Sequence, residues 1–342
     1  MQHERYREFR PGVDDAGKRI DRVLRRMLPD VRLGDIFAII RNGRVRVNGR
    51  KVKVRHRLST QDVLQLERSL SASVSVPGNN HPTPRYGRPG SRARSDGPSS
   101  GAGSIADTYR LADSILFENE HLLCLNKPRG ITVHGPSSVH SWVKHYLSGQ
   151  LSPSLSFRVG PLHRIDRNTS GIVFFSKSSQ GARRFTSLMR NGVPRKVYVA
   201  ILSGSLRSPE VWEDHVVRDR DARRTDVSET GSKAITAVYP VLWTEHYSLA
   251  LCTIQTGRTH QIRTQAAHHG HPLLGDGKYG GGPGTYALHA LAFILPYRDQ
   301  ELGFQHVYAA PPEKFDSMVK QHFGHIPPDL LLQSLQSAAA LL

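Results

Sequence analysis

Cysteine is scarce in this sequence, and long apolar runs are missing. Only two cysteines, Cys124 and Cys252, occur among the 342 residues, far apart and in no spacing typical of metal ligands. We therefore expect both to pack as small apolar side chains in a reducing compartment, without a disulfide. No uninterrupted apolar stretch approaches the roughly 20 residues that a membrane helix needs, and the first 30 residues are too charged for a secretory signal. These absences favour a cytoplasmic protein with no membrane partner.

Acidic residues are also few. The chain has 29 Asp and Glu against 47 Lys and Arg, which gives a formal net charge of +18. The excess is concentrated near the start, because residues 1–68 hold 15 Arg and 3 Lys but only 9 acidic residues. Arginine suits the bidentate recognition of phosphate. A basic region of this kind predicts a polyanionic partner such as nucleic acid.

Residues 69–104 contain almost nothing that could form a core. Of these 36 residues, 20 are Gly, Pro or Ser, a composition typical of a flexible linker. The sequence thus predicts a small basic domain at residues 1–68, a linker at 69–104 and a larger domain at 105–328. Residues 329–342 would form a C-terminal tail, either a terminal helix or a frayed end.

The small domain has the periodicity of two helices followed by a hairpin. Apolar residues recur at helical spacing over residues 20–28, with arginines on the remaining surface. A second apolar cluster at 36–40 runs into Asn42-Gly43, which is a typical helix stop. In RVRVNGRKV, alternating valines lead to Asn48-Gly49, a strong signal for a hairpin turn.

This region resembles the S4 RNA-binding module over roughly residues 17–68. The module's G-x-V-x-V-N-G hairpin is matched by Gly43, Val45, Val47, Asn48 and Gly49. The resemblance implies a small α/β domain whose basic helix face docks on folded RNA through the phosphate backbone. The residues that we predict to contact RNA in this domain are Arg19, Arg22, Arg26, Arg44 and Arg46.

From Ile105 onward, short segments rich in β-branched and aromatic residues are separated by turns. The strand-like segments are ILFENEHLLCLNK, IVFFSK, KVYVAILSG, AITAVYPVL and YSLALCTIQTG, and the helical ones are WVKHYL and residues 181–190. No regular alternation of strand and helix is visible. We therefore expect an α+β fold around a mostly antiparallel mixed sheet.

Three polar motifs interrupt these strands. HRIDRNTSG covers residues 163–171, KVYVA follows Arg195, and QTGRTHQIR covers residues 255–263. Alone, each has an ordinary interpretation: a turn capped by Asp and Asn, a core tyrosine on a strand, and the polar start of a helix.

Together and in this order, the motifs resemble those of the RluA-type RNA pseudouridine synthases. The family signature H-R-[LI]-D-x-x-T-S-G is matched from His163 to Gly171, and T-G-R-T-H-Q-I-R is matched from Thr256 to Arg263. Three further family motifs, K-x-Y-x-A, N-K-P-x-G-x-x-V-H and G-H-P-x-x-G-D-x-x-Y-G, begin at Lys196, Asn126 and Gly270. Two positions depart from the family pattern, with Gln265 and Leu295 in place of histidines.

The resemblance implies an isomerisation that needs neither metal nor nucleotide cofactor and replaces the N1–C1′ bond of uridine by a C5–C1′ bond. Asp166 would be the reactive carboxylate, either as a nucleophile at the sugar carbon or as the base that forms a glycal. Arg263 would be its salt-bridge partner. Tyr198 would stack on the uracil and is a candidate for the final C5 deprotonation. The target base would be flipped out of its helix into the pocket.

Five further side chains of the larger domain are predicted RNA contacts, with a structural role as the alternative for the first of them: His163, Arg164, Lys196, Arg258 and His260. An S4 module before such a domain is a familiar arrangement in family members that act on large-subunit ribosomal RNA. The resemblance therefore favours 23S ribosomal RNA over transfer RNA as the partner. It also implies a bacterial enzyme, which we expect to act as a monomer.

Two other interpretations stay open. A metal hydrolase is suggested by a group of histidines and one aspartate, although their spacing fits no known ligand pattern closely; the residues are His260, His268, His269, His271, His289 and Asp276. A non-catalytic RNA-binding protein that keeps the fold would also explain the charge. The presence of Asp166, Tyr198 and Arg263 argues against that second alternative.

Overall fold

The computed structural model describes residues 5–71, 74, 111–219, 221–327 and 329–341. Most of the predicted linker at 69–104 lies outside these residues. The chain divides into two compact units. Unit 1 comprises Met1–Arg110 together with Lys144–Val159, and unit 2 comprises Leu111–Val143 together with Gly160–Leu342.

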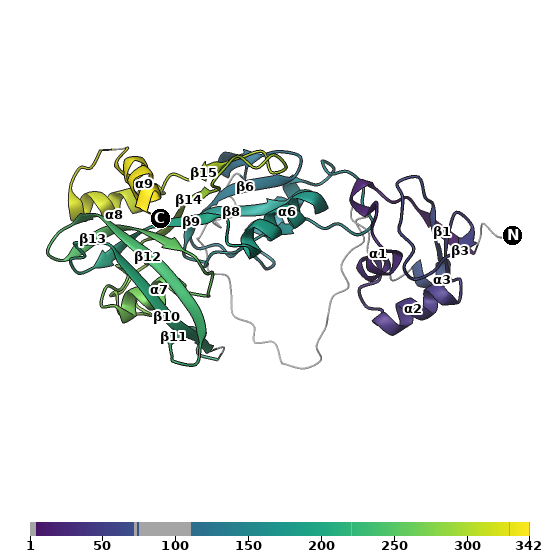
Figure 1. The fold of residues 1–342 in the computed structure, drawn as a ribbon, viewed down its shortest axis with the longest axis horizontal. Coiled ribbons are helices and arrows are strands. Elements are labelled where there is room, and N and C mark those ends of the chain that lie inside the picture. The colour runs from purple at the N-terminus through teal and green to yellow at the C-terminus, as the bar shows by residue number, and fades with distance from the viewer. Residues whose placement is uncertain (1–4, 72–73, 75–110, 220, 328, 342) are drawn as a thin grey trace, which may run out of the picture. The chain divides into compact units, whose positions relative to one another are not determined.

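Unit 1 packs two helices against a four-stranded sheet with the order β1-β4-β2-β3 (Figure 1). The helices bury the apolar stripe that the sequence predicts, with Ile20, Val23 and Leu24 fully inaccessible. The elements are β1 (Tyr6–Phe9), η1 (Val13–Asp15), α1 (Ile20–Met27), α2 (Leu33–Arg41), β2 (Val45–Val47), β3 (Arg50–Lys51), β4 (Leu64–Glu67) and α3 (Arg68–Ser71). The predicted helices and the hairpin are confirmed.

The turn between β2 and β3 explains why Asn48 and Gly49 occur there. Their φ angles are 51° and 76°, both in the left-handed region that a two-residue hairpin turn of type I′ requires. Glycine and asparagine tolerate that region better than other residues. The side chain of Asn48 also bonds Asp62 and the N–H of Val63, so the turn is tied to the segment before β4.

Unit 2 is built on an eleven-stranded sheet in the described residues, with the main order β11-β10-β12-β13-β9-β14-β8-β6-β5 and with β15 on β14 and β7 on β8. Its first elements are η2 (Leu111–Ser114), β5 (Ile115–Glu118), β6 (Leu122–Lys127), α5 (Val139–Tyr146), whose last three residues belong to unit 1, β7 (Gly160–Pro161), β8 (Ser170–Ser176), α6 (Ser179–Arg190) and β9 (Arg195–Ser203). The others are β10 (Glu210–Asp219), β11 (Arg224–Val227), β12 (Ser232–Trp243), β13 (Tyr247–Ile254), α7 (Gln261–His268), β14 (Leu288–Ile294), β15 (His306–Tyr308), α8 (Glu313–Phe323) and α9 (Leu330–Leu341).

The strands of this sheet pair antiparallel, except for β8 with β14, which pair in parallel in the described residues. The expected α+β fold with a mostly antiparallel mixed sheet is confirmed. Among the described residues, the helices are too short or too polar to cross a membrane.

Both faces of the central strands are covered by helices (Figure 1). On β9, Val199 and Ile201 face a core shared with α8 and α9, whereas Ala200 and Leu202 face a core shared with α7. This alternation is the period of two expected of a strand that is buried on both sides. Of the two alternatives for the C-terminal tail, the structure has the helix α9, whose Leu331 belongs to the first of these cores.

Candidate active site

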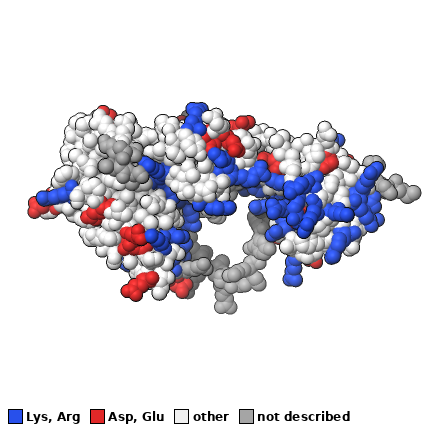
Figure 2. Space-filling view, viewed as in Figure 1, with Lys and Arg blue, Asp and Glu red and all other residues white. Residues whose placement is uncertain are grey.

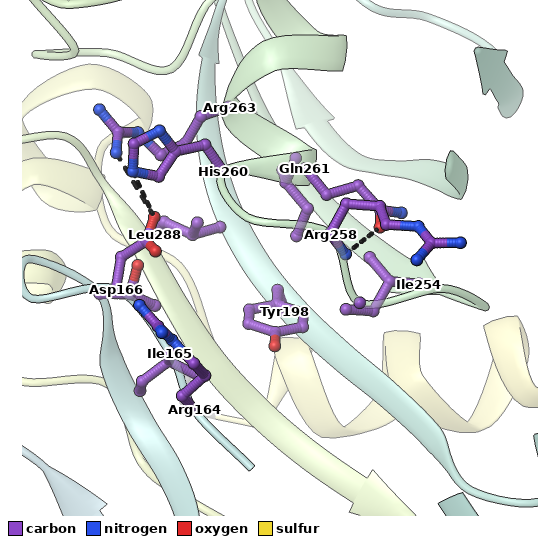
Figure 3. Close-up of a pocket in the computed structure, with 13 residues that line it drawn as sticks. Arg164, Ile165, Asp166, Tyr198, Ile254, Arg258, His260, Gln261, Arg263 and Leu288 are labelled. Carbon is purple, nitrogen blue, oxygen red and sulfur yellow. Dashed lines mark hydrogen bonds and ion pairs between the residues drawn. The ribbon is translucent and has the colours of Figure 1, made fainter. Parts of the chain in front are cut away.

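The three polar motifs of unit 2 meet at one cavity of about 80 Å³. Asp166, Tyr198 and Arg263 line it, although they are far apart in sequence and come from a turn, from β9 and from α7. Figure 3 shows Asp166 facing Arg263 and His260, with the Tyr198 ring between this group and Arg258. The other lining residues are Arg164, Ile165, Thr169, Ile254, Gly257, Arg258, His260, Gln261, Ile262 and Leu288.

A second and wider cavity of about 560 Å³ adjoins the first, since Arg164, Asp166 and Arg263 line both. Exposed basic side chains contribute to its wall, among them Arg218 and Arg223 near the β10–β11 turn. The Asp166 carboxylate therefore lies where a small pocket opens into a larger, basic one.

Asp166 lies in the turn that leads into β8, in the middle of the sheet. The turn closes with a hydrogen bond from the N–H of Thr169 to the carbonyl of Asp166 at 3.2 Å. It ends at Gly171, where φ is +110° and a Cβ atom would lie 2.2 Å from the carbonyl oxygen of Ala290. Only glycine fits this close approach of β8 to β14. The glycine of the motif thus fixes where the turn that holds Asp166 ends.

Lys127, at the end of β6, is hydrogen-bonded to the same turn. Its side chain has no exposed surface, and its Nζ donates to the carbonyls of Pro128, Ile131 and Arg167 at 2.7, 2.9 and 3.1 Å. Three acceptors match the three donors of an ammonium group. Burial lowers the pKa of Lys127 to about 7, against the attraction of Asp166. This lysine ties β6 to the residue that follows the reactive aspartate.

Arg263 contacts two carboxylates at once. Its Nη1 lies 3.4 Å from Asp166 Oδ2, while its Nε and Nη2 donate to Asp276 at 2.7 and 2.9 Å. The rings of Tyr279 and Tyr286 lie 4.9 and 4.2 Å from the guanidinium carbon. Burial opposes the charge, but the hydrogen bonds that Arg263 donates to Asp276 and the surrounding negative charge outweigh it and raise the pKa of Arg263 above its ordinary value. The guanidinium is therefore a permanent cation in a fixed orientation.

His260 begins α7 in the left-handed region, with a φ of 55°. Such a conformation is unusual for a non-glycine residue and often marks a functional site. It directs Nε2 to within 3.8 Å of Asp166 Oδ2, while Nδ1 pairs with the Tyr279 hydroxyl at 2.8 Å. Burial lowers the pKa of His260, although the charge of Asp166 acts the other way.

The hydroxyl of Tyr198 is a neutral phenol at neutral pH. Burial, and then the negative charge of Asp166, raise the pKa of Tyr198 well above its ordinary value. The ring stands on β9 at the wall of the small cavity. Tyr198 therefore presents the flat face of a neutral phenol to the cavity, and not a phenolate.

The predicted RNA contacts of unit 2 do not share one environment. Arg164 is exposed and lines both cavities. Arg258 is exposed and donates to the carbonyl of Lys233 at 3.0 Å. Lys196 is partly buried on β9, and this burial lowers its pKa. His163 differs from these three because its ring packs among phenylalanines.

The His163 ring packs against Phe174, Phe185 and Phe293, with centroid distances of 5.9, 6.1 and 6.3 Å. Its Nε2 accepts the N–H of Phe174 at 3.1 Å. Burial, and then the charge of Lys196, lower the pKa of His163 to about 4, so the ring is neutral. These contacts fit the structural alternative for His163, and its contact with RNA stays a prediction.

The five arginines predicted to bind RNA in unit 1 fall into two groups. Arg22 and Arg26 are exposed on α1. Arg19 is paired with Asp21, Arg44 with Glu67, and the guanidinium of Arg46 lies 5.1 Å from the ring of Tyr6. Lys and Arg cover much of the visible face of this unit (Figure 2). The sequence-based reasoning did not separate the free from the paired side chains.

The sequence-based reasoning also assigned no role to Lys127, Tyr279 or Tyr286, and it named Asp276 only as a metal ligand. All but Tyr286 fall inside family motifs, at N-K-P and at G-D-x-x-Y-G. The motifs therefore marked these positions, but they did not indicate what each side chain does. Among the described residues, no group of three or more His, Cys, Asp and Glu side chains is placed to hold a metal ion. Cys124 and Cys252 are free and buried, as predicted.

Comparison with known proteins places these features in a family. The model of the RNA pseudouridylate synthase family matches residues 121–268, and that of the S4 domain matches residues 18–64. The ribosomal large subunit pseudouridine synthase C of Vibrio vulnificus (strain CMCP6) is 32% identical over 268 residues, 78% of each chain. The protein of the same name from Escherichia coli (strain K12) is 31% identical over 278 residues, again 78% of each chain.

Two solved structures share the fold. Human RNA Pseudouridylate Synthase Domain Containing 4 is 22% identical with a TM-score of 0.54, over 64% of this chain and 95% of that one. Human RNA Pseudouridylate Synthase Domain Containing 1 is 21% identical with a TM-score of 0.51, over 65% and 94%.

Proposed function

The chain belongs to the RNA pseudouridylate synthase family, and on that premise we propose that it converts uridines of large-subunit ribosomal RNA into pseudouridine. The observation that carries the proposal is the meeting of Asp166, Tyr198 and Arg263 at one cavity. The names of the curated relatives supply the class of RNA, and the S4 match supplies a second RNA-binding surface. We retain 23S ribosomal RNA as the specific partner, and a cytoplasmic monomer as the form of the enzyme.

The reaction is an isomerisation in which atoms and electrons balance within the substrate. The N1–C1′ bond breaks, the uracil turns, C5 bonds to C1′, and the proton on C5 leaves while N1 gains one. No oxidant, reductant or additional atom enters. What the site must supply is a group that stabilises the detached sugar and walls that keep the free base in place.

We assign the task of stabilising the detached sugar to Asp166, either as the nucleophile or as the base that forms a glycal. Its Oδ2 faces Arg263 and His260, which leaves Oδ1 for the ribose. The fixed cation at Arg263 lies 3.4 Å from this carboxyl group and offers it an opposite charge. Because Arg263 is held by Asp276, it keeps its place while the charge on Asp166 changes during the reaction.

We assign the task of keeping the free base in place to Tyr198 and the apolar walls of the small cavity. The neutral phenol ring stacks on the uracil, and Ile254 and Leu288 line the same small cavity. A stacked uridine must first be extruded from its helix, at a cost of a few kcal/mol. Arg164, exposed where the two cavities join, is placed to hold the adjacent phosphate or to fill the vacated stack.

RNA affinity comes in this proposal from the basic surface of unit 1 together with the wide cavity of unit 2. Arg22 and Arg26 are exposed and so are the strongest candidates for direct phosphate contact. Arg19, Arg44 and Arg46 are engaged with neighbouring side chains, and we propose that they contact RNA only through their remaining donors.

The test is tritium release from large-subunit ribosomal RNA transcribed with [5-³H]uridine, since the reaction expels the C5 hydrogen to water. Wild type should release tritium, and Asp166→Asn, which keeps the shape but removes the charge, should release none above background. Sequencing for pseudouridine in the same RNA identifies the site. Equal modification by wild type and Asp166→Asn would overturn the catalytic assignment.

A folded-state control accompanies this experiment. Tryptophan fluorescence suits it, because Trp142, Trp212 and Trp243 all lie in unit 2. The Asp166→Asn protein should show the wild-type spectrum and urea midpoint. A lost spectrum would mean that the variant reports on folding, and Asp166→Glu would then replace it in the release assay.

A further inference from the structure

Asp15, at the end of η1, is a buried carboxylate that the RNA-binding surface does not use. It has no exposed surface, and it accepts five hydrogen bonds, four of them from residues 154–156. Oδ1 accepts from Ser154 Oγ at 3.0 Å, from Ser156 N at 3.0 Å and from Ser156 Oγ at 2.6 Å. Oδ2 accepts from Leu155 N at 2.7 Å. Buried charge is tolerated only when it is satisfied in this way.

The segment that satisfies Asp15 belongs to unit 1 although its sequence lies inside the synthase match at 121–268. We call residues 153–156 the anchor segment. Leu155 is 4% exposed and joins the core formed by α1, α2 and the small sheet. Lys18 Nζ donates to Ser156 Oγ at 3.1 Å. Polar and apolar contacts therefore hold the same short stretch.

Gly12 gives an independent sign that the anchor segment is tightly seated. A Cβ atom on Gly12 would lie 1.7 Å from the carbonyl oxygen of Pro153. The φ of Gly12 is −90°, which any residue adopts. The anchor segment, and not the local backbone conformation, is what excludes a side chain at this position.

We propose that the anchor segment couples RNA held by unit 1 to the catalytic turn of unit 2, with Asp15 as the positioning residue. The inference rests on the proposed function. Ser156 and Asp166 are ten positions apart in the chain, a connection that extends to about 35 Å at most. RNA bound to the basic face of unit 1 is thereby tied through a short connection to the residue that performs the chemistry.

The partner that this device fits is a large folded RNA that contacts both units. For such an RNA, an anchored connection raises the effective concentration of the target uridine at the active site. A short stem-loop that contacts unit 2 alone gains nothing from it. Release of the anchor segment should therefore raise KM for the large RNA and leave the reaction on the short RNA unchanged.

Two variants of the full chain release the anchor segment by different means. Asp15→Asn removes the charge that its donors require, and Gly12→Ala inserts a methyl group against Pro153. Gly34→Ala in α2 is the matched control, because nothing lies within 4 Å of a Cβ atom there. Hydrogen exchange over residues 150–160 reports the anchor directly, since the N–H groups of Leu155 and Ser156 donate to Asp15.

We expect both releasing variants to exchange faster at Leu155 and Ser156 and to raise KM for large-subunit RNA about tenfold. We expect kcat on a stem-loop substrate to stay within twofold of wild type, and Gly34→Ala to match wild type throughout. Unchanged KM despite faster exchange, or an equal loss on both RNAs, would overturn the inference. Absence of activity in wild type on either RNA would instead count against the proposed function.

Discussion

Arg263 contacts two carboxylates, and its closer partner is Asp276. The two hydrogen bonds to Asp276, at 2.7 and 2.9 Å, are shorter than the contact with Asp166 at 3.4 Å. Asp276 is 2% exposed and is not among the residues that line either cavity. Asp276 therefore contacts the cavity lining through the two hydrogen bonds that it accepts from Arg263. A bidentate carboxylate of this kind fixes the plane of a guanidinium.

Replacing Asp276 by Asn should lower kcat about 100-fold with little change in KM. The amide keeps one acceptor but loses the charge, so Arg263 is no longer held against Asp166. A 100-fold loss corresponds to about 2.7 kcal/mol of transition-state stabilisation. Steady-state tritium release over a range of RNA concentrations separates kcat from KM.

The matched control for that variant is Asp214→Asn. Asp214, on β10, also accepts from residues near α7, namely Gln265 at 2.7 Å and His269 at 3.1 Å. Its substitution removes the same charge from a partly buried site without touching Arg263. We expect kcat within twofold of wild type, and an equal loss in the two variants would show that Asp276 has no special role.

At the scale of elements, the parallel contact between β8 and β14 is the junction that places the catalytic turn. His289 on β14 crosses it, with Nδ1 at 2.9 Å from Ser170 Oγ on β8 and Nε2 at 2.9 Å from the carbonyl of Ala309. A carbonyl only accepts, so Nε2 carries the proton and Nδ1 accepts from the hydroxyl. The two hydrogen bonds at the junction therefore require a neutral imidazole.

This junction makes unit 2 sensitive to acid. Burial, aided by the charge of Arg129 and opposed by the hydrogen bond to Ala309, lowers the pKa of His289 from 6.5 to about 4. The unfolded chain therefore binds the proton more readily, and stability present above pH 6.5 is lost as the pH falls towards 4. At pH 5 the share of His289 in this loss is about 2 kcal/mol, and His163, whose pKa burial also lowers to about 4, adds a share of similar size. Urea unfolding followed by tryptophan fluorescence at pH 7.5 and pH 5 measures it.

His289→Gln should reduce this pH dependence by about 2 kcal/mol, because the variant has no proton to take up. His246→Gln, in the exposed turn before β13, should keep the dependence of wild type. If the free energy of unfolding falls equally in the two variants between pH 7.5 and pH 5, the acid sensitivity does not arise at the junction.

Elements with strong local signals were predictable, and elements defined by distant contacts were not. The stripe from Ile20 to Leu28 and the turn at Asn48-Gly49 each carry their signal within one or two turns of chain, and both are confirmed. β10, with the sequence EVWEDHVVRD, was not predicted because its apolar residues form two adjacent pairs and do not alternate with polar ones, so only its neighbours identify it as a strand.

The candidate site divides in the same way. The motifs named Asp166, Tyr198 and Arg263, since family patterns carry them in sequence. Lys127 is fully buried and donates to three carbonyls, whereas lysine is usually exposed. No local sequence pattern predicts this burial. The anchor segment depends on contacts between residues about 140 positions apart, which periodicity cannot reveal.

At the scale of the whole molecule, charge governs the encounter with RNA. The net charge of +18 predicts binding that weakens steeply with salt, because each phosphate contact releases counterions. The arginines of unit 1 that are exposed on one helix, Arg22 and Arg26, should account for part of this dependence.

The double variant Arg22→Gln/Arg26→Gln should lower the slope of log K against log salt concentration by about 2. Filter binding of large-subunit RNA between low and physiological salt measures the slope. Arg183→Gln/Arg190→Gln removes two exposed arginines from α6 and serves as the matched control. Equal changes in the two double variants would mean that total charge matters and α1 does not.

The two cysteines give the molecule a practical property. Cys124 on β6 and Cys252 on β13 are both fully buried, and burial raises the pKa of Cys252 to about 12 and that of Cys124 well above its ordinary value. The native fold therefore protects both thiols from alkylation. A maleimide dye will label only a cysteine introduced deliberately, so one dye on each unit can follow how the enzyme moves during catalysis without removing a native residue.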